Sequence, residues 1–372
     1  MNSRLFTLIG VIAALLLAAC GGAAPAPASS APAGSAAAKT SAAAASPATS
    51  AAAGAKPSVS AKPSIAPAPP GTILAAYSEL TPINTPLWAA VDTGIFKKNG
   101  LTVDARLIES SLGVGALLSD EVKFAAMGGS EALAATVEGA DLVVLLTLSP
   151  VYPYKLEVRN DIKTAQDLKG KKLGISRIGS SSDSATRAAL RKLGLDADKD
   201  VQLIQVGSLA ARMAALTSGA LDGAVAALPD TVDMEKGNLH PLLDLAAERL
   251  PAVNNTLVAK RSYVNANKDT VQKYVDSVVE GMARVKKDKG LMLELVKKYL
   301  KERGGSEQAL DETFDFYANK VFRIPPATTP ELFQDSITQL AEKNPRAKGF
   351  DLKMMIDNSF VENADKRGVG KS

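Results

Sequence analysis

The pattern of apolar and polar residues divides this chain of 372 residues into three parts. An apolar run extends from Leu5 to Leu17, and residues 21–70 then consist almost entirely of Ala, Pro, Ser, Gly and Thr. From Thr72 onward, short apolar runs alternate with segments of helical periodicity. Because a segment with little to bury cannot offset the entropy of ordering, we expect residues 21–70 to be a disordered tether. We therefore expect the packed core in the third part of the chain.

The third part begins with a first set of strands and helices. Residues 141–148 form a Val and Leu run that is typical of a strand covered on both faces. The predicted strands of this set are 72–77, 101–108, 122–127 and 141–148, and its predicted helices are 86–98, 112–118 and 130–138. Such alternation predicts mostly parallel sheets with right-handed crossovers.

A second set of alternating elements begins after Asp161. Its predicted strands are 172–176, 201–206, 223–227 and 241–245, and its predicted helices are 181–193, 210–217 and 230–236. Two such sets with a break between them predict two α/β lobes, each with its own sheet.

Beyond Asn254 the pattern becomes helical. An amphipathic stripe runs over residues 271–285 at the spacing of a helix face, and further helices are predicted over 291–300, 310–322 and 330–342. Because the second set already forms a complete unit, these helices are expected to pack on the first lobe. We therefore assign residues 71–158 and 253–372 to lobe 1 and residues 159–252 to lobe 2.

The start of the chain has the marks of a secretory signal. Arg4 precedes the apolar run, and small residues precede Cys20 in the sequence Leu-Ala-Ala-Cys-Gly. The run is shorter than the roughly 20 apolar residues that span a bilayer. Leu-Ala-Ala-Cys resembles the lipobox of bacterial lipoproteins, which implies that residues 1–20 are a signal peptide and that Cys20 is lipidated. The alternative is an ordinary signal peptide with an incidental cysteine.

Composition limits the possible partners. The chain has 43 Lys and Arg residues against 39 Asp and Glu residues, a formal charge of +4, so no strong field favours nucleic acid. One histidine and one cysteine are too few ligands for a zinc or copper site, and no disulfide can form within the chain. We expect neither a metal nor a cofactor.

Candidate site residues follow the rule that ligands bind beyond the carboxyl ends of strands in open parallel sheets. That rule selects four loops, and the long strand 141–148 leads in addition to tyrosines near the predicted crossing between lobes. The candidates are Thr81, Asn84, Gly129, Ser130, Tyr152, Arg177, Ser180, Ser181, Ser182, Pro229 and Asp230.

The three serines give the most informative signal among these candidates. Their hydroxyls stand at a predicted helix start, where free backbone N–H groups and the helix dipole favour a carboxylate, sulfonate or phosphate. The alternative role is N-capping, for which one serine suffices. Arg177 is either an anion ligand or a surface residue, and Tyr152 and Tyr154 either stack on a ligand or pack the hinge. The segment 174–181 has the glycine spacing of a P-loop, but Ser180 replaces the required lysine, which argues against nucleotide hydrolysis.

Several short motifs, read together, resemble a known family. They are Pro-Leu-Trp-Ala-Ala at 86–90, Gly-Ile-Phe-Lys-Lys-Asn-Gly-Leu at 94–101, Asp-Ile-Lys at 161–163, Asp-Leu-Lys-Gly-Lys-Lys at 167–172, Gly-Ser-Ser-Ser at 179–182, and Ala-Ala-Leu-Thr-Ser-Gly-Ala-Leu-Asp at 214–222. Over residues 72–364 the chain is similar to nitrate/sulfonate/taurine-type substrate-binding proteins of ABC importers. The resemblance implies a type 2 periplasmic-binding fold, with two lobes joined by two crossing strands and a ligand in the cleft.

The expected function is that of a monomeric, lipid-anchored solute receptor outside the cytoplasmic membrane or in the periplasm. It would bind a small anionic organic molecule, such as a sulfonate or carboxylate, and deliver it to an ABC permease without catalysing a reaction. One alternative is a pyrimidine-precursor-related binding protein or synthase of the same fold, although the related enzymes use a histidine and a cysteine-rich segment that this chain does not match. Another is a sensor that signals to a partner.

Replacement of the lipobox thiol tests the anchor. We expect Cys20→Ser to release the protein from the membrane fraction, because serine has no thiol to accept the lipid, whereas Ser30→Ala in the tether leaves localisation unchanged. Fractionation followed by immunoblotting measures the distribution. Full membrane retention of Cys20→Ser would contradict the lipid anchor.

Overall fold

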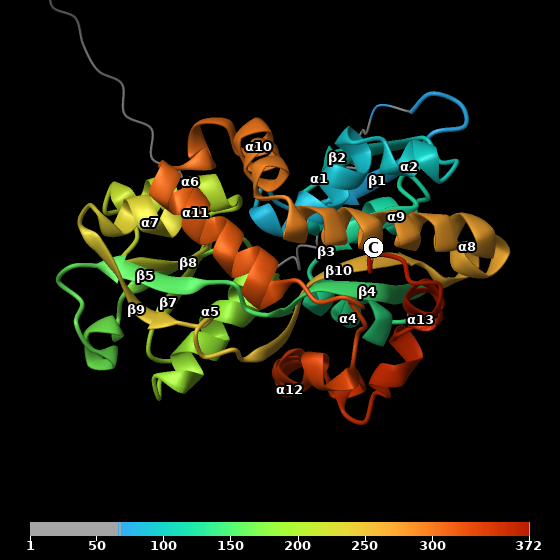
Figure 1. The fold of residues 1–372 in the computed structure, drawn as a ribbon. Coiled ribbons are helices and arrows are strands. Elements are labelled where there is room, and N and C mark those ends of the chain that lie inside the picture. The colour runs from blue at the N-terminus through green and yellow to red at the C-terminus, as the bar shows by residue number, and fades with distance from the viewer. Residues whose placement is uncertain (1–65, 67, 372) are drawn as a thin grey trace, which may run out of the picture. The chain divides into compact units, whose positions relative to one another are not determined.

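Two five-stranded sheets organise the computed structural model of the protein, which describes residue 66 and residues 68–371 (Figure 1). The first sheet has the order β2 (Val103–Leu107), β1 (Ile73–Tyr77), β3 (Phe124–Met127), β10 (Pro251–Lys260), β4 (Leu142–Val151). The second has the order β7 (Gln202–Gln205), β6 (Lys172–Ile175), β8 (Gly223–Ala226), β5 (Lys155–Arg159), β9 (Leu239–Asp244). Each sheet with its covering helices is called a lobe below. The expected signal peptide with Cys20, and nearly all of the expected tether, lie outside the described residues.

Helices connect and cover these strands. The α-helices are α1 (Thr85–Asp92), α2 (Ile95–Lys98), α3 (Ser110–Leu118), α4 (Gly129–Val137), α5 (Ser181–Lys192), α6 (Leu209–Thr217), α7 (Asp230–Glu235), α8 (Arg261–Ala266), α9 (Lys268–Lys287), α10 (Lys289–Leu300), α11 (Glu307–Phe314), α12 (Gln334–Lys343) and α13 (Ser359–Lys366). Short 3₁₀ segments are η1 (Pro82–Asn84), η2 (Ala165–Leu168), η3 (Lys301–Gly304), η5 (Pro330–Phe333), η6 (Pro345–Ala347) and η7 (Leu352–Met355), and η4 (Asp315–Val321) is a π-helix. Within the described part of the chain, no helix combines the length and apolarity needed to cross a membrane.

The predicted fold of two α/β lobes is confirmed, with a difference in strand direction. In each sheet three strands pair in parallel, β2-β1-β3 in the first and β7-β6-β8 in the second. The strands beyond them are antiparallel, because the chain leaves one sheet by β4 and enters the other as β5, then returns from β9 into β10. Both sheets are therefore mixed rather than mostly parallel.

The crossing strands lie at the expected lobe boundaries, which stay predictions. β5 belongs to the second sheet, so the boundary expected after residue 158 falls inside a strand. Neither β5 nor β10 was predicted as a strand. β10 carries Asn254 and Asn255 at its centre, both buried, and asparagine is depleted in strands, so the sequence pattern did not reveal it.

Most other predicted elements lie within a few residues of the observed ones, and the main exception is the helix predicted over residues 86–98. It is divided into α1 and α2 at Gly94, whose φ of 75° lies in the left-handed region that glycine adopts without strain. The division turns α2 away so that Ile95 and Phe96 both reach the core.

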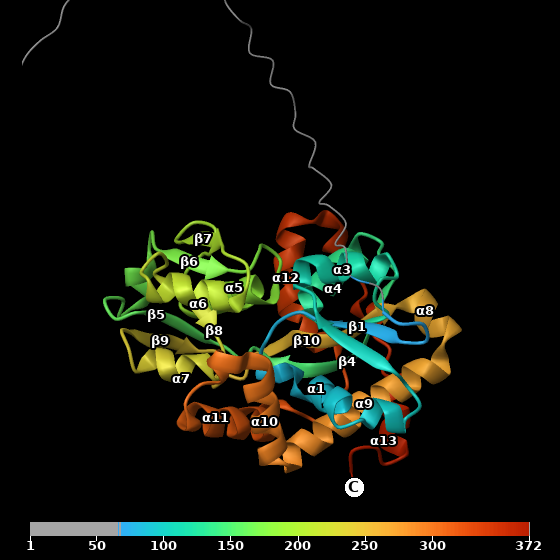
Figure 2. The same cartoon turned by 90° about the horizontal axis from the view of Figure 1, so that it is seen from above.

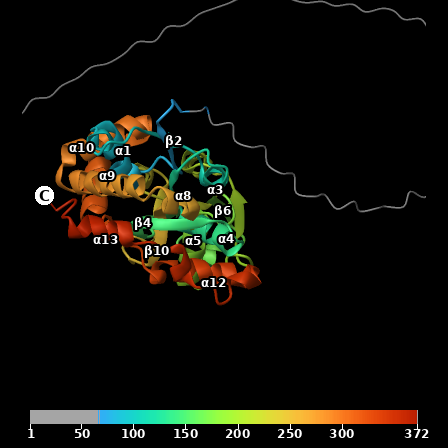
Figure 3. The same cartoon turned by 90° about the vertical axis from the view of Figure 1, so that its right-hand side faces the viewer.

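Helix α9 packs on the first lobe as predicted (Figure 3). Its residue Tyr274 stacks on Phe124 of β3 with ring centroids 3.8 Å apart. Gly281 permits a close approach to α1, because a Cβ at that position would lie 2.2 Å from the carbonyl oxygen of Pro86. The apolar stripe of residues 271–285 is therefore core, as expected.

Later C-terminal elements contact the second lobe as well (Figure 2). Near α7, Ser306 donates a hydrogen bond to Asp233. At α12, the carboxylate of Asp335 pairs with Arg191 of α5, and Lys343 pairs with Asp198 at 2.9 Å. The C-terminal segment therefore joins the two lobes at two places, in addition to the crossing strands.

A buried carboxyl group lies in the middle of the second sheet. Glu157 of β5 is 0% exposed. Burial is the main cause that raises the pKa of Glu157 from 4.5 to about 8. The negative charges of Glu235 and Asp244 raise it further, whereas the positive charge of Lys155 lowers it. Between these values the folded protein keeps a proton that the unfolded chain has lost, so the free energy of unfolding falls as pH rises through this window.

We expect Glu157→Gln to remove that dependence. The variant should gain stability over the wild type as pH rises from about 4.5 to about 8, with a limit of about 5 kcal/mol set by 1.36 kcal/mol per pKa unit. Urea unfolding at several pH values measures the difference. The control is Glu294→Gln, which replaces an exposed glutamate of α10. A constant difference between Glu157→Gln and the wild type across this range would contradict the prediction.

Candidate functional site

A pocket of about 360 Å³ lies between the lobes, at the ends of the parallel strands of both sheets. Its lining comprises Ser78, Glu79, Leu80, Leu107, Glu109, Glu131, Tyr154, Ser176, Arg177, Ser180, Ser181, Ser182, Gly207, Ser208, Leu209, Ala210, Arg212 and Arg303. A larger hollow of about 840 Å³ lies on the second lobe by the C-terminal end of α6. Because ligands of such folds gather at carboxyl ends of strands, the smaller pocket is the candidate site.

The serine loop that follows β6 is held by its own hydroxyl groups. Ser180 is the N-cap of α5, where its Oγ accepts from the backbone N–H of Asp183 at 3.3 Å and donates to the carbonyl of Arg177 at 2.7 Å. The Oγ of Ser182 accepts from the backbone N–H of Ser176 at 2.9 Å and lies 2.9 Å from the Oγ of Ser180. Ser181 donates to the carbonyl of Asn254 in the crossing strand β10 at 3.1 Å. The serines therefore shape the loop as well as line the pocket.

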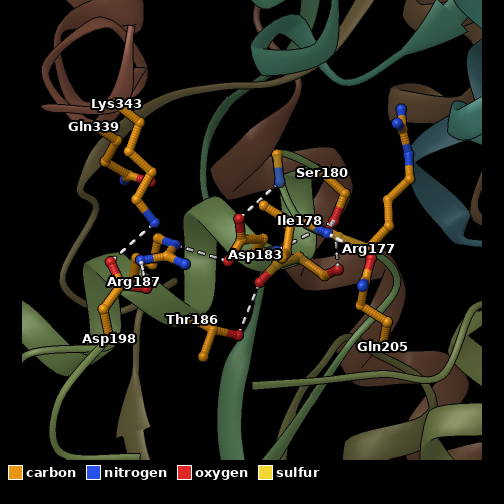
Figure 4. Close-up of polar contacts among 12 residues, drawn as sticks. Arg177, Ile178, Ser180, Asp183, Thr186, Arg187, Asp198, Gln205, Gln339 and Lys343 are labelled. Carbon is orange, nitrogen blue, oxygen red and sulfur yellow. Dashed lines mark hydrogen bonds and ion pairs between the residues drawn. The ribbon is translucent and has the colours of Figure 1, made fainter. Parts of the chain in front are cut away.

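An ion-pair network supports this loop from behind (Figure 4). Asp183 accepts from the backbone N–H of Gly179 at 2.7 Å and from Nε of Arg187 at 2.8 Å. Arg187 also contacts Asp198 at 3.0 Å, and Asp198 in turn pairs with Lys343 of α12. The Asp183–Arg187 pair is buried, so removal of one partner would leave an uncompensated charge. The network fixes the loop and connects it to the C-terminal segment.

Arg212 is a buried cation in the pocket lining. Its side chain extends from α6, and the residue is 2% exposed. One guanidinium nitrogen donates to the carbonyl of Gly207 at 2.7 Å, whereas Nε is buried without a hydrogen-bond partner among the described residues. Burial lowers the pKa of Arg212, but an arginine remains charged in a protein. A buried N–H donor in a pocket needs an acceptor, which a bound ligand can supply.

Glu79 faces this cation from the first lobe. The hydroxyl of Tyr154 donates to the Glu79 carboxylate at 3.4 Å. Burial raises the pKa of Glu79, while Arg212, the Tyr154 hydroxyl and Arg303 act in the opposite direction. Burial, followed by the charge of Glu79, raises the pKa of Tyr154 well above its usual value, so this phenol stays a donor.

Arg303 enters the pocket from the C-terminal segment. Asp230 of α7 accepts two hydrogen bonds from its guanidinium, at 3.1 and 2.7 Å, in the paired geometry that orients arginine. A further N–H donates to the carbonyl of Leu80 at 3.4 Å. Burial raises the pKa of Asp230, and the adjacent Arg303 opposes that shift. Asp230 is thus placed to orient Arg303, although it does not itself line this pocket.

The predicted site residues divide into two groups. Arg177, Ser180, Ser181 and Ser182 line the pocket, whereas Thr81, Asn84, Gly129, Ser130, Tyr152, Pro229 and Asp230 do not. For the residues of both groups, a role as ligand contact stays a prediction.

The residues outside the lining have structural neighbours of their own. Asn84 donates to the carbonyl of Glu79 at 2.8 Å and so supports the loop that carries this carboxylate. Tyr152 donates to Asp335 at 2.9 Å, and Pro229 follows a cis peptide bond. Ser130 lines a separate hollow beside α5, and Thr81 is buried next to η1.

Five charged residues of the lining were not predicted from the sequence, namely Glu79, Glu109, Glu131, Arg212 and Arg303. The carboxyl-end rule itself selects Glu79 and Glu109, since each directly follows a predicted strand by one or two residues. Arg212 also left a signal, because it interrupts the apolar face that Leu209, Met213 and Leu216 give to α6. Nothing in the local pattern marks Arg303. Within residues 68–371, no group of three or more His, Cys, Asp or Glu side chains is arranged to hold a metal ion.

Comparison with known proteins places the chain in a family. Residues 81–289 match the NMT1/THI5-like family, and because this span exceeds half of the chain, the protein belongs to that family. A protein of Bacillus subtilis (strain 168), provisionally named as the binding protein YtlA, is 27% identical over an alignment of 202 residues that covers 52% of this chain and 60% of the relative. The match therefore spans less than two thirds of that curated relative.

Solved structures share the fold. The alkanesulfonate-binding protein SsuA from Xanthomonas axonopodis pv. citri, bound to MOPS, has a TM-score of 0.61 at 17% identity, covering 80% of this chain and 98% of the other. The desulfurization enzyme DSZB has a TM-score of 0.58 at 19% identity, covering 79% and 99%. The predicted resemblance to substrate-binding proteins is thus confirmed at the level of family and fold, and the same fold also supports an enzyme.

Gly129, one of the predicted ligand contacts, has a packing role that can be tested. A Cβ at this position would lie 2.3 Å from a methyl carbon of Val253 and 2.8 Å from its backbone oxygen in β10. We expect Gly129→Ala to lower the free energy of unfolding by about 1–3 kcal/mol, because the backbone of the crossing strand cannot move aside cheaply. Urea denaturation measures the loss. In the control Gly115→Ala, the added Cβ meets nothing within 4 Å, and unchanged stability of Gly129→Ala would refute the packing role.

Proposed function

We propose that this NMT1/THI5-like protein is the exported, lipid-anchored solute receptor of an ABC importer. It binds a small organic anion between its lobes and presents it to a permease. The observation that carries the proposal is Arg212, a buried guanidinium in the wall of a pocket between the lobes, whose Nε has no hydrogen-bond partner among the described residues. Guanidinium groups bind carboxylates, sulfonates and phosphates through directed, charge-assisted hydrogen bonds.

The serine loop supports an anion in the same pocket. α5 begins at Ser181 and contains 12 residues, so its positive end points toward the loop that lines the pocket. Ser176 and Ser181 add hydroxyl groups to this wall. The SsuA structure, whose ligand MOPS is a sulfonate, provides a precedent for an organic anion in this fold.

Capture of the solute is proposed to draw the lobes together. Residues of both lobes line the pocket, so a ligand that contacts both sides is bound more tightly in the closed arrangement and shifts the population toward it. The lobes are proposed to comprise residues 71–151 with 251–371, and residues 155–250, as the sheet pairing suggests. We propose binding without chemical turnover, which separates this protein from the enzyme DSZB of the same fold.

Ligand binding can be tested by thermal unfolding with a panel of alkanesulfonates, aminoalkanesulfonates, carboxylates and amino acids. A true ligand at 100-fold excess over its Kd should add about 2.7 kcal/mol to the stability of the folded state. Arg212→Ala should weaken binding by about 10- to 100-fold, because a hydrogen bond to a charged group contributes about 1.5–3 kcal/mol. Arg212→Lys keeps the charge but not the Nε donor and should bind with intermediate affinity.

The matched control is Arg346→Ala, which removes an exposed arginine that pairs with Glu138. Calorimetry gives the affinities, and circular dichroism shows whether each variant is folded. Wild-type affinity in a folded Arg212→Ala variant, or a melting temperature that no panel compound changes, would overturn the proposal.

A further inference from the structure

The charged side chains of the pocket are divided between the lobes by sign. All the carboxylates of the lining, Glu79, Glu109 and Glu131, belong to the first lobe. The guanidinium groups of Arg177 and Arg212 belong to the second lobe. Arg303 belongs to the C-terminal segment, and it donates paired hydrogen bonds to Asp230 of the second lobe and a longer one, at 3.4 Å, to the carbonyl of Leu80 in the first lobe. The pocket therefore has an acidic wall and a basic wall.

The acidic wall follows from the topology of the first sheet. Its three parallel strands β1, β2 and β3 end at one edge, and each is followed within a few residues by one of the glutamates. Glu79 follows β1 by two residues, Glu109 follows β2 before α3, and Glu131 lies in the first turn of α4 after β3. One sheet edge thus presents three carboxylates to the same space.

The basic wall has the same construction on the second sheet. Arg177 follows β6, and Arg212 lies in α6, which follows β7. The third parallel strand, β8, leads to Asp230, which holds Arg303. Each parallel strand of the first sheet is therefore followed by a glutamate, and each parallel strand of the second sheet is followed by an arginine or by the aspartate that orients one.

Glu79 and Arg212 are the pair of opposed charges on which the inference rests. Glu79 and Arg212 attract one another across the pocket, but their hydrogen bonds go elsewhere: Glu79 accepts from Tyr154, and Arg212 donates to the carbonyl of Gly207. In the part of the chain that the structure describes, the buried Nε of Arg212 has no hydrogen-bond acceptor. A ligand with only negative charge would supply that acceptor but would lie against the carboxylates of the opposite wall, where repulsion in a water-poor site weakens binding.

We propose that the solute is a zwitterion, a small acid that also carries a protonated amine. The acid group accepts from Arg212 on the second lobe, and the ammonium group donates to the carboxylates of the first lobe. This inference rests on the proposed function and specifies the class of solute that the pocket binds. The pocket of about 360 Å³ has room for a compound of amino-acid size. Such a ligand forms charge-assisted hydrogen bonds with both walls, which favours the closed arrangement of the lobes.

Matched pairs of compounds test the inference by calorimetry on the full-length protein. The pairs are propanesulfonate with 3-aminopropanesulfonate, butanoate with 4-aminobutanoate, and propylphosphonate with 3-aminopropylphosphonate, and they distinguish the possible acid groups. In at least one pair the amine should raise affinity tenfold or more, while propylamine alone does not bind. Equal or tighter binding of the amine-free acids overturns the zwitterion but upholds the proposed function. Binding by none of the acids counts against the proposed function itself.

Charge-removing variants then locate the ammonium group. Glu79→Gln, Glu109→Gln and Glu131→Gln keep the shape of the side chain, and we expect at least one to lose tenfold or more in affinity for the amine-bearing acid. The amine-free acid should bind the same variant as well as, or better than, the wild type. Glu109 is exposed, so its replacement is expected to leave the fold intact.

The control Glu294→Gln, an exposed site on α10, should change neither affinity. Thermal unfolding without ligand identifies any variant that fails to fold, in which case Glu109→Gln alone decides. If every folded glutamate variant lost the same affinity for the amine-bearing acid as for its amine-free partner, the inference would be overturned.

Discussion

The double crossing of the chain between its two sheets is the constraint on which the rest of the structure depends. Because β5 and β10 enter the opposite sheet antiparallel to their neighbours, the three parallel strands of each sheet end at a common pocket. Loops at the carboxyl ends of parallel strands are free of ladder hydrogen bonds and carry polar side chains at little cost to the core. The crossing therefore places the pocket-lining loops of both lobes opposite one another.

The C-terminal segment contributes a further charged residue to the pocket lining. It covers the first lobe through α9, but it also supplies Arg303, which Asp230 of the second lobe orients. At α12 it reaches Asp198, and from there the Arg187–Asp183 pair leads back to the serine loop. A chain of hydrogen bonds and ion pairs thus links the loop that lines the pocket to the C-terminal segment.

Buried charged groups lie in two different environments in this molecule, the interior of a sheet and the lining of a pocket. Glu157 lies inside the second sheet, away from the pocket lining, and it lowers stability near neutral pH because its pKa is raised to about 8 by burial. Arg212 and Glu79 are also desolvated, but they face a cavity in which a ligand can compensate them. Location in a pocket, rather than burial itself, therefore distinguishes candidate ligand contacts from buried charges that only affect stability.

The sequence by itself determined the two α/β sets, the helical C-terminus and the serine loop, because hydrophobic periodicity and helix capping act over a few residues. It also placed Arg177, Ser180, Ser181 and Ser182 in a loop that lines the pocket. It did not reveal β5, whose short run carries Glu157, or β10, whose buried asparagines do not resemble a strand. Only the tertiary structure brought Arg212, Arg303 and Glu79 into one pocket, since these residues are far apart in sequence and line the same space only because the chain crosses twice between the sheets.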